Sequence, residues 1–382
     1  MTPPQPQKTI QEKDPLAGSM AHEVRRFRHD LPIEEAATPP ASWYTRRELN
    51  ELEQRTVFRR SWQYACPTDM LARPGEYVRV DFLGESVLLV RGEDGVLRGF
   101  SNVCRHHAAL LLEGEGCVEK LVCPYHGWTY DLAGCLRSAP GMGAMKNFAR
   151  EDFRLPPVPV EVFGPLVFFH PGKPARSVAE ELAPLARQLD EFGMGGLKHV
   201  LRRRYPIACN WKVFCDNYLD GGYHVAHLHK GLAGQLAMPE YKTELFERFN
   251  VQSCPSATDA QFHGRDFRER IGRGALYAWI HPNLMLNRYG AILDTNWAVP
   301  LGVDRCKVVF DYWFHDTEGE EARRLIQASL EASDDVQQED VAICESVQRG
   351  VSGRSYDTGR YTRTETGMYQ FHRLLAEDML AE

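Results

Sequence analysis

Two short cysteine–histidine pairs, sixteen residues apart, constrain this chain more than any other feature of its sequence. Cys104 and His106 form a C-x-H pair, and Cys123 and His126 form a C-x2-H pair. Thiolates and imidazoles are the protein ligands that transition metals prefer, and four of them at this spacing rarely occur together by chance. The pattern therefore predicts a metal centre with four protein ligands.

Two kinds of centre use two cysteines and two histidines. A structural zinc site usually has both cysteines first, as C-x2–4-C followed by H-x3–5-H, and this chain lacks that order. In a Rieske [2Fe-2S] cluster two thiolates hold one iron and two imidazoles hold the other, which matches two mixed pairs. The stretch "CPYHGWTYDLAGCL" also resembles Rieske sequences. A Rieske cluster is therefore expected, with the adjacent His107 outside the ligand set.

Composition excludes several other classes of protein. The chain has 382 residues and a net charge of -7, so it lacks the basic excess that phosphate binding requires, and no nucleic-acid partner is expected. No apolar run approaches the ~18 residues of a membrane helix, and the N-terminus lacks the apolar core of a signal peptide. Ten scattered cysteines fit a reducing compartment better than a disulfide framework. A cytoplasmic location is expected.

The chain divides into three regions by composition and periodicity. Residues 1–40 are proline-rich and polar at their start and are expected to form a flexible arm. Residues 41–165 contain one amphipathic helix, then short β-runs with tight turns, and then both metal-binding pairs on loops. Residues 166–382 mix strands with helices. Because strands and helices do not alternate strictly, the α+β class is predicted rather than a doubly wound sheet.

A second metal site is predicted in the later region. His224 and His229 form an H-x4-H pair within "NWKVFCDNYLDGGYHVAHLHK". With one carboxylate from elsewhere they would complete a two-histidine, one-carboxylate facial triad, which leaves open positions on Fe(II). His227 competes for a place in this set. Buried structural histidines are the alternative explanation.

The Rieske motif together with "NWK…DNYLDGGYH…H" resembles the oxygenase component of the Rieske non-haem iron oxygenases, from about residue 41 onward. The resemblance implies an N-terminal all-β Rieske domain followed by an α+β catalytic domain with an antiparallel sheet and helices, similar to a helix-grip fold. It implies His224 and His229 as ligands of a mononuclear iron. The third ligand would be Asp340 in "QEDVAICESVQRG", with Glu339 as the alternative. In this family arginine and glycine commonly follow the first histidine, where this chain has His107 and Ala108.

The same resemblance implies how electrons arrive. Asp220 would bridge His224 to the cluster of a neighbouring subunit, with Asp216 as the alternative, and Asn217 of the same motif would belong to the catalytic group. The cofactors would be the [2Fe-2S] cluster, Fe(II) and O2, with NAD(P)H acting through a separate flavin/iron–sulfur reductase or a ferredoxin. A homotrimer is the expected assembly.

Several later stretches, including "HPNLMLNRYGAILDTNW", resemble choline monooxygenase and its bacterial relatives, which hydroxylate a carbon beside a quaternary ammonium. Aromatic faces and a carboxylate bind such a cation well. The residues expected to supply them are Trp279, Tyr289, Trp297 and Tyr356, with Asp294 as the charge partner. Two alternatives remain open. One is an aromatic-ring dioxygenase α subunit or an O/N-demethylase, and the other is a Rieske electron carrier, which would have no use for the second metal site.

Overall fold

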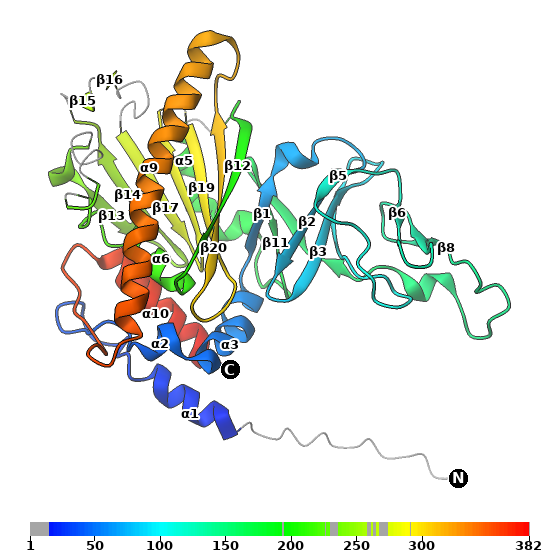
Figure 1. Cartoon of the computed structure of the whole chain (residues 1–382), viewed down its shortest axis with the longest axis horizontal. Coiled ribbons are helices and arrows are strands. Elements are labelled where there is room, and N and C mark those ends of the chain that lie inside the picture. Colours follow the sequence, from blue (N-terminus) through cyan, green and yellow to red (C-terminus); the bar gives the residue numbers. More distant parts are fainter. Residues whose placement is uncertain are drawn as a thin grey trace.

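The structure, a computed structural model, describes residues 15–192, 195–225, 227–229, 236–257, 261–262, 265–266, 274–290 and 292–381. Figure 1 shows a large lobe built on a long-stranded sheet and a smaller all-β lobe that projects from one side of it. The described helices are α1 (Pro15–Val24), α2 (Ser42–Thr45), α3 (Arg47–Thr56), α4 (Val178–Glu181), α5 (Ala183–Phe192), α6 (Trp211–Tyr218), α9 (Gly319–Val351) and α10 (Thr366–Leu380).

The large lobe is organised by a seven-stranded antiparallel sheet with the strand order β12-β20-β19-β18-β17-β14-β13. Helix α9 crosses one face of this sheet, and α6 packs against α9 (Figure 1). Apolar side chains of the central strands are almost entirely buried, as expected for a sheet covered by helices. The strands are β12 (Lys198–Ile207), β13 (Lys242–Leu245), β14 (Phe249–Pro255), β17 (Gly274–Ile280), β18 (Leu284–Tyr289), β19 (Ile292–Pro300) and β20 (Cys306–Phe314), beside the small pair β15 (Gln261–Phe262) and β16 (Arg265–Asp266).

The small lobe contains two antiparallel sheets. One has the strand order β5-β2-β3-β4-β9, and the other has the order β6-β7-β8. The strands are β2 (Glu76–Phe82), β3 (Glu85–Arg91), β4 (Leu97–Ser101), β5 (Glu115–Cys117), β6 (Leu121–Val122), β7 (Thr129–Tyr130), β8 (Leu136–Ser138) and β9 (Pro157–Val158). Short strands joined by tight turns leave the connecting loops free to present ligands, and both cysteine–histidine pairs lie on such loops.

A third sheet joins the two lobes. It consists of β1 (Gln63–Pro67), β11 (Leu166–Phe169) and β10 (Val160–Phe163). The buried Asp311 carboxylate on β20 accepts hydrogen bonds from Tyr64 (2.7 Å), His199 (2.8 Å) and Arg202 (2.7 Å). Strands β10 and β11 form one hairpin, so a domain boundary after residue 165 would cut a hydrogen-bonded pair. The boundary after residue 165 stays a prediction, and this hairpin favours a junction beyond β11.

The N-terminal segment differs from the flexible arm expected over residues 1–40. Residues 1–14 lie outside the described residues, but Val24 and Phe27 are fully buried, and the Phe27 ring packs edge-on against Trp43 (5.5 Å between ring centroids). These apolar contacts anchor the segment to the large lobe. The single amphipathic helix expected next is divided into α2 and α3, because Arg46 between them has an extended backbone.

Helix α3 belongs to the large lobe, although the sequence grouped it with the small one. It contacts α10, and its Glu53 forms a fully buried ion pair with Lys212 of α6 (2.5 Å). The same carboxylate accepts a hydrogen bond from the Trp211 indole (2.9 Å). Buried charges require such partners, so this contact fixes α6 against the N-terminal helices.

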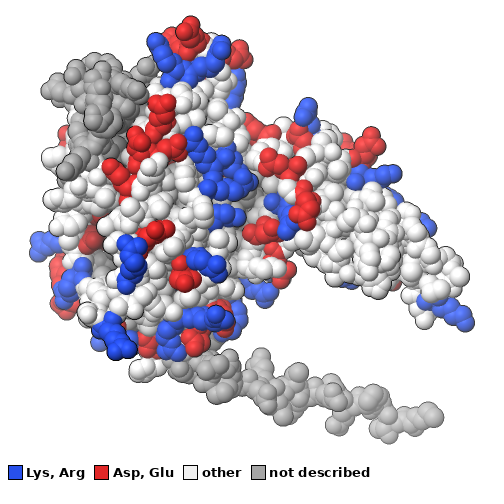
Figure 2. Space-filling view, viewed as in Figure 1, with Lys and Arg blue, Asp and Glu red and all other residues white. Residues whose placement is uncertain are grey.

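The remaining fold predictions agree with the structure. The class is α+β, and α9 is a single helix of 33 residues. Among the described residues no helix has the length and apolarity that crossing a membrane requires. Figure 2 shows acidic and basic side chains interspersed over the visible face of the large lobe, and a broad uncharged area on the small lobe.

Candidate active site

The two loops that carry the cysteine–histidine pairs have the same backbone geometry. The Cys104 N–H donates to Ala109 O (2.8 Å), and the Cys123 N–H donates to Trp128 O (2.8 Å). In return, the carbonyls of Cys104 and Cys123 each accept a hydrogen bond (3.1 Å) from the N–H four residues later. Equivalent turns present equivalent ligands, so each loop contributes one thiol and one imidazole.

The four side chains separate by chemical type. The thiols of Cys104 and Cys123 are both buried, at 3% exposure each. The imidazoles of His106 and His126 lie side by side (4.7 Å between ring centroids) and closer to solvent. The buried Nδ1 of His106 has no hydrogen-bond partner among the residues that the structure describes. Two inner thiols and two outer imidazoles fit a [2Fe-2S] cluster with one iron for each type.

Two aromatic residues support this arrangement. The Trp128 ring stacks on the His106 ring (4.6 Å, 9° between planes). The Tyr130 hydroxyl accepts a hydrogen bond from the Arg105 N–H (3.0 Å) and contacts the Cys104 sulfur (3.5 Å). Groups of this kind fix ligand orientation and tune redox potential. His107 is exposed beside His106, and its side chain is not needed to complete the four ligands.

The two loops differ at the residue four positions after each cysteine. Both residues are left-handed, with φ +59° at Ala108 and φ +70° at Gly127. A residue with a Cβ costs about 1–2 kcal/mol in this conformation. We therefore expect Ala108→Gly to stabilise the cluster loop by about 1 kcal/mol, and Gly127→Ala to destabilise it by about 1–2 kcal/mol. A Cβ at Gly127 meets no atom closer than Pro140 Cγ at 3.9 Å, so the cost is the backbone's alone.

The denaturant midpoint for loss of the cluster's visible absorption measures both effects. Shifts of opposite sign are expected from the two variants. Shifts in the same direction would show that packing around the loops, rather than backbone conformation, controls their stability.

The second site begins where α6 ends. Asn210 caps this helix through the Lys212 N–H (3.1 Å), and the helix stops at Tyr218, shortly before two consecutive glycines. Gly221 and Gly222 both have left-handed backbones (φ +71° and +76°). A Cβ at Gly221 would lie 2.3 Å from the Thr364 carbonyl, so only glycine fits. The tight turn directs the following residues into the space between α6, α9 and the sheet.

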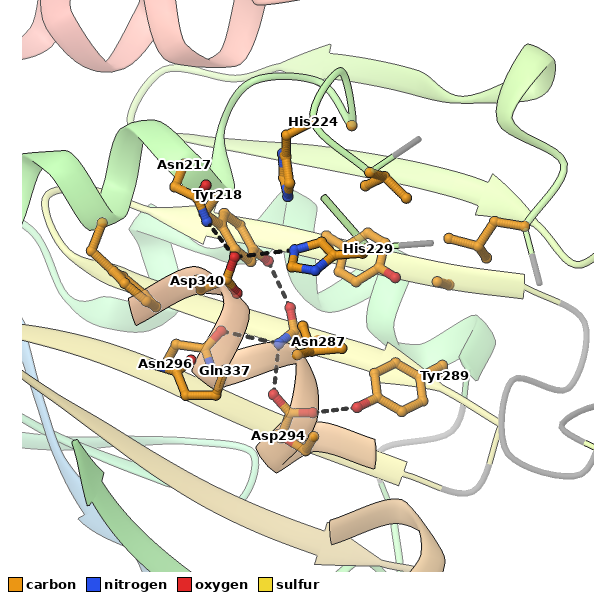
Figure 3. A pocket seen from close by; sticks show the side chains of 18 of the residues that line it. Asn217, Tyr218, His224, His229, Asn287, Tyr289, Asp294, Asn296, Gln337 and Asp340 are labelled. Carbon is orange, nitrogen blue, oxygen red and sulfur yellow. Dashed lines mark hydrogen bonds and ion pairs between the residues drawn. The ribbon is translucent and has the colours of Figure 1, made fainter. Parts of the chain in front are cut away.

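His224, His229 and Asp340 converge in this space. One ligand atom from each lies within 4.8 Å of the other two, and no other group of three or more potential ligands is this compact in the described part of the chain. Asn217 donates a hydrogen bond to Asp340 Oδ1 (2.7 Å), which orients the carboxylate. Figure 3 shows the three side chains pointing toward one another from the loop after α6 and from α9. This donor set matches a facial triad for Fe(II).

Each histidine of this group has a carboxylate at its Nδ1 atom. His224 Nδ1 donates to Asp220 Oδ2 (2.7 Å), and His229 Nδ1 donates to Glu339 Oε2 (2.7 Å). Asp220 also accepts the backbone N–H groups of Tyr223 (3.1 Å) and His224 (2.8 Å). Such contacts fix the tautomer in which Nε2 is free to bind a metal.

The alternative candidates lie elsewhere. Glu339 contacts the Nδ1 side of His229, away from the Nε2 atom that faces Asp340 (3.1 Å). Asp216 accepts hydrogen bonds from Tyr44 and His372 (both 2.8 Å), on a different side of α6 from His224. The His227 side chain is exposed. Geometry thus favours Asp340 over Glu339 as the third ligand, and Asp220 over Asp216 beside His224.

A metal ion must compete with protons for His229. Burial of the His229 ring opposes its charged form, but hydrogen bonds to Asp340 and Glu339 outweigh this and raise the pKa of His229 above its ordinary value. A metal ion must displace that proton, so its binding weakens as the pH falls.

A cavity of about 150 Å³ opens beside the three convergent residues. Figure 3 shows His224, His229 and Asp340 at one end, Asp294 with Tyr289 at the other, and Asn287 between them. Asp294 accepts hydrogen bonds from Tyr289 OH (2.5 Å) and Asn287 Nδ2 (2.6 Å). The lining residues in the described part of the chain include no lysine or arginine. This cavity is therefore anionic in character, with aromatic walls.

Of the residues expected to bind substrate, Tyr289 and Asp294 line the cavity and the others do not. The Trp297 ring faces the opposite side of the sheet and stacks on Phe82 (5.8 Å), because it stands an odd number of residues from Asp294 on β19. Trp279 lies farther along β17 and packs against Phe371 of α10 (5.3 Å). Tyr356 is exposed and bonds to Thr38. The prediction was wrong for these three residues.

Three tyrosines and an asparagine of the cavity were not predicted from the sequence. Tyr218, Tyr241 and Tyr277 line the cavity, and Tyr218 donates a hydrogen bond to Asn287 Oδ1 (2.9 Å). The period of two on β18 places Asn287 on the same face as Tyr289, so alternation would have identified it. Tyr241 comes from a distant strand end, and no local pattern indicates its place.

Comparisons with known proteins agree with this architecture. The Rieske [2Fe-2S] domain family matches residues 61–149, and the ring hydroxylating alpha subunit (catalytic domain) family matches residues 194–381. The chain is 41% identical to the chloroplastic choline monooxygenase of Arabidopsis thaliana, over 93% of this chain and 86% of that protein. It is 31% identical to the carnitine monooxygenase oxygenase subunit of Escherichia coli (strain K12), over 90% and 94%.

A solved structure provides a further comparison. The quaternary ammonium Rieske monooxygenase CntA in complex with its substrate L-carnitine superposes with a TM-score of 0.79 at 27% identity, covering 91% of this chain and 99% of the other. Both domains are thus present in the order found in these relatives, and they are the domains that hold a Rieske cluster and a mononuclear iron. The chain belongs to the Rieske non-haem iron oxygenases, as the oxygenase (α) component that receives electrons from a separate protein and uses O2 to oxidise a small molecule.

Proposed function

We propose that this chain is the terminal oxygenase of a multicomponent system that hydroxylates a small quaternary ammonium compound of the choline type. The observation that carries this proposal is the pairing of Asp294 with tyrosine faces at the end of the cavity opposite Asp340. A carboxylate and aromatic rings attract a permanent cation, and a trimethylammonium group offers no N–H for stronger hydrogen bonds. The names of the relatives, choline and carnitine monooxygenases, support the same substrate class.

The reaction is a monooxygenation. One C–H bond of the substrate becomes C–OH, the second oxygen atom leaves as water, and two electrons and two protons are consumed. His224, His229 and Asp340 would hold the iron, and the iron would activate O2. Asp294 and Tyr289 would hold the cation so that a carbon at the other end of the substrate points toward that centre.

The alternative substrates fit this cavity less well. An aromatic acid would need a cation for its carboxylate, and no lysine or arginine lines the described part of the cavity. An uncharged ring would leave the buried Asp294, at 2% exposure, without a recognition role. An electron carrier alone would not require the convergence of His224, His229 and Asp340.

The electron path supports a proposed homotrimer. Within one chain the loops beside β6 and β8 lie at the far end of the molecule from α6 and α9 (Figure 1). The cluster end bears the exposed side chains of Tyr125 (64%) and Met145 (54%), which suit a protein contact. We propose that His126 of one subunit meets Asp220 of the next, and that a flavin/iron–sulfur reductase or ferredoxin supplies electrons from NAD(P)H.

A reducing compartment such as the cytoplasm fits this assignment. All ten cysteines of the chain are free thiols in the structure. Six of them are buried and lie outside the cluster site: Cys66, Cys209, Cys215, Cys254, Cys306 and Cys344. Reduced thiols are the usual state in such compartments.

Substrate-dependent O2 uptake tests the proposed function. The purified chain would be supplied with electrons by NADPH, a plant-type ferredoxin reductase and its ferredoxin. We expect uptake with choline or a related trimethylammonium compound, and no increase over background with its neutral analogue, in which carbon replaces the nitrogen. Uptake with benzoate or naphthalene but not with any quaternary amine would overturn the proposal.

The variant Asp294→Asn tests how the cation is recognised. It keeps the side-chain shape and removes the negative charge, so a charge-assisted interaction of about 1.5–3 kcal/mol should be lost. We expect KM for the quaternary amine to rise about 10- to 100-fold. The visible absorption of the cluster and the iron content should stay unchanged. An unaltered KM would exclude Asp294 from substrate binding.

A further inference from the structure

The two histidines of the proposed iron site are held by carboxylates that differ in origin and in surroundings. Asp220 lies on the same loop as His224, and its side chain is only 10% exposed. Glu339 comes from α9, more than a hundred residues from His229 in sequence, and its side chain is 48% exposed. The His229 ring itself is 3% exposed. Glu339 thus reaches from the surface to a buried imidazole.

Helix α9 contacts the same imidazole on both of its nitrogen atoms. Glu339 Oε2 lies 2.7 Å from His229 Nδ1, and Asp340 Oδ1 lies 3.1 Å from His229 Nε2. Consecutive helical residues point about 100° apart, so these two neighbours approach the ring from different sides. Only Nε2 faces the position shared with His224 and Asp340.

The contact at Nδ1 has a chemical consequence at Nε2. A neutral imidazole carries one proton, and a carboxylate that accepts the Nδ1–H keeps the proton there and leaves the Nε2 lone pair free. The same hydrogen bond fixes the plane of the ring and makes Nε2 a stronger metal ligand. Because Glu339 is partly in water, its negative charge carries little desolvation cost.

We propose that Glu339 is a positioning residue that holds the tautomer and orientation of His229 and thereby raises metal affinity at the second site. This inference rests on the proposed iron site, and it is independent of the substrate. It gives α9 two roles, since one helix supplies a ligand, Asp340, and orients another, His229. It also reassigns Glu339, which sequence had offered only as an alternative ligand.

Metal titration in the absence of substrate and O2 tests this proposal. The purified protein, with its Rieske cluster intact, would be freed of its mononuclear iron by anaerobic chelation. It would then be titrated with Co(II), whose visible absorption bands report binding. Loss of an outer carboxylate typically weakens metal binding about 10- to 100-fold, and we expect that change in Kd for Glu339→Ala. Glu339→Gln keeps an acceptor oxygen without the charge and should fall between Glu339→Ala and the unaltered chain.

Asp335→Ala is the matched control, because Asp335 is an exposed acid on the same helix outside the site. Its Kd for Co(II) should equal that of the unaltered chain. A Glu339→Ala variant with unchanged Kd overturns the proposal, as does one that binds no Co(II) at all, like Asp340→Ala, since Glu339 would then be a ligand. A purely structural role would lower the melting temperature of the metal-free chain without changing Kd. No outcome depends on which substrate the chain oxidises.

Discussion

The variant Asp340→Ala is expected to lose the mononuclear iron and all measurable product while it keeps the full visible spectrum of the Rieske cluster. Asp340 supplies the only carboxylate of the three convergent ligand groups. Loss of a group that only hydrogen-bonds to a metal ligand typically lowers metal affinity or activity about 10- to 100-fold. Loss of a ligand itself should therefore reduce turnover by more than 100-fold. The cluster should be unaffected, because its loops lie in the other lobe (Figure 1).

Iron content, acid-labile sulfide and product yield measure this effect together. The unaltered chain should hold one more iron than the variant, with the same sulfide content. Asp335→Ala, on the exposed face of α9, should behave as the unaltered chain in all three measurements. Retained iron and turnover in Asp340→Ala, with loss of both in Glu339→Ala, would move the third ligand by one residue.

The variant Asp220→Asn should separate the supply of electrons from the presence of the metals. The substitution keeps the volume of the side chain but removes the charge that accepts His224 Nδ1–H and two backbone N–H groups. We expect both metal centres to remain loaded and the cluster to be reducible by an external donor. Reoxidation of the cluster by O2 in the presence of substrate should slow about 10- to 100-fold.

Rapid-mixing absorbance of the chemically reduced protein follows this reoxidation. Asp216→Asn provides the control, because this acid lies on α6, only four residues before Asp220, but contacts Tyr44 and His372. Loss of those charge-assisted hydrogen bonds should lower the melting temperature and leave the reoxidation rate of the folded protein unchanged. Slow reoxidation in Asp216→Asn with a normal rate in Asp220→Asn would reverse the two assignments.

Local spacing was sufficient to predict the ligand groups that a single loop presents. The C-x-H and C-x2-H pairs each occupy one tight turn, so each turn presents one thiol and one imidazole however the rest of the chain folds. The turn at Gly221 and Gly222 is local in the same sense, and it brings His224 near Asp220. Such features depend on a few consecutive backbone angles, which residue type specifies directly.

Residues that meet through tertiary packing were less predictable. Asp340 lies on a helix that packs across the sheet, and only the family resemblance selected it over Glu339. In the cavity, the choice of Trp279 and Trp297 failed because aromatic composition does not specify which face or which end of a strand meets a cavity. Strand alternation alone separates Asp294 from Trp297, since they stand three positions apart on β19 and therefore point to opposite faces of the sheet. The position of Tyr241 in the cavity wall could be identified only from the folded structure.

We expect electrons stored in this chain to drive the oxidation of a quaternary ammonium compound. A single-turnover experiment tests it most directly: the protein is reduced chemically, freed of excess reductant without O2, and then mixed with O2 and choline. We expect the Rieske absorption to return and an oxidised product, identified by mass spectrometry, to form in proportion to the amount of chain, with none from the neutral carbon analogue. Return of the absorption without product from any quaternary amine, together with product from an aromatic compound, would contradict it.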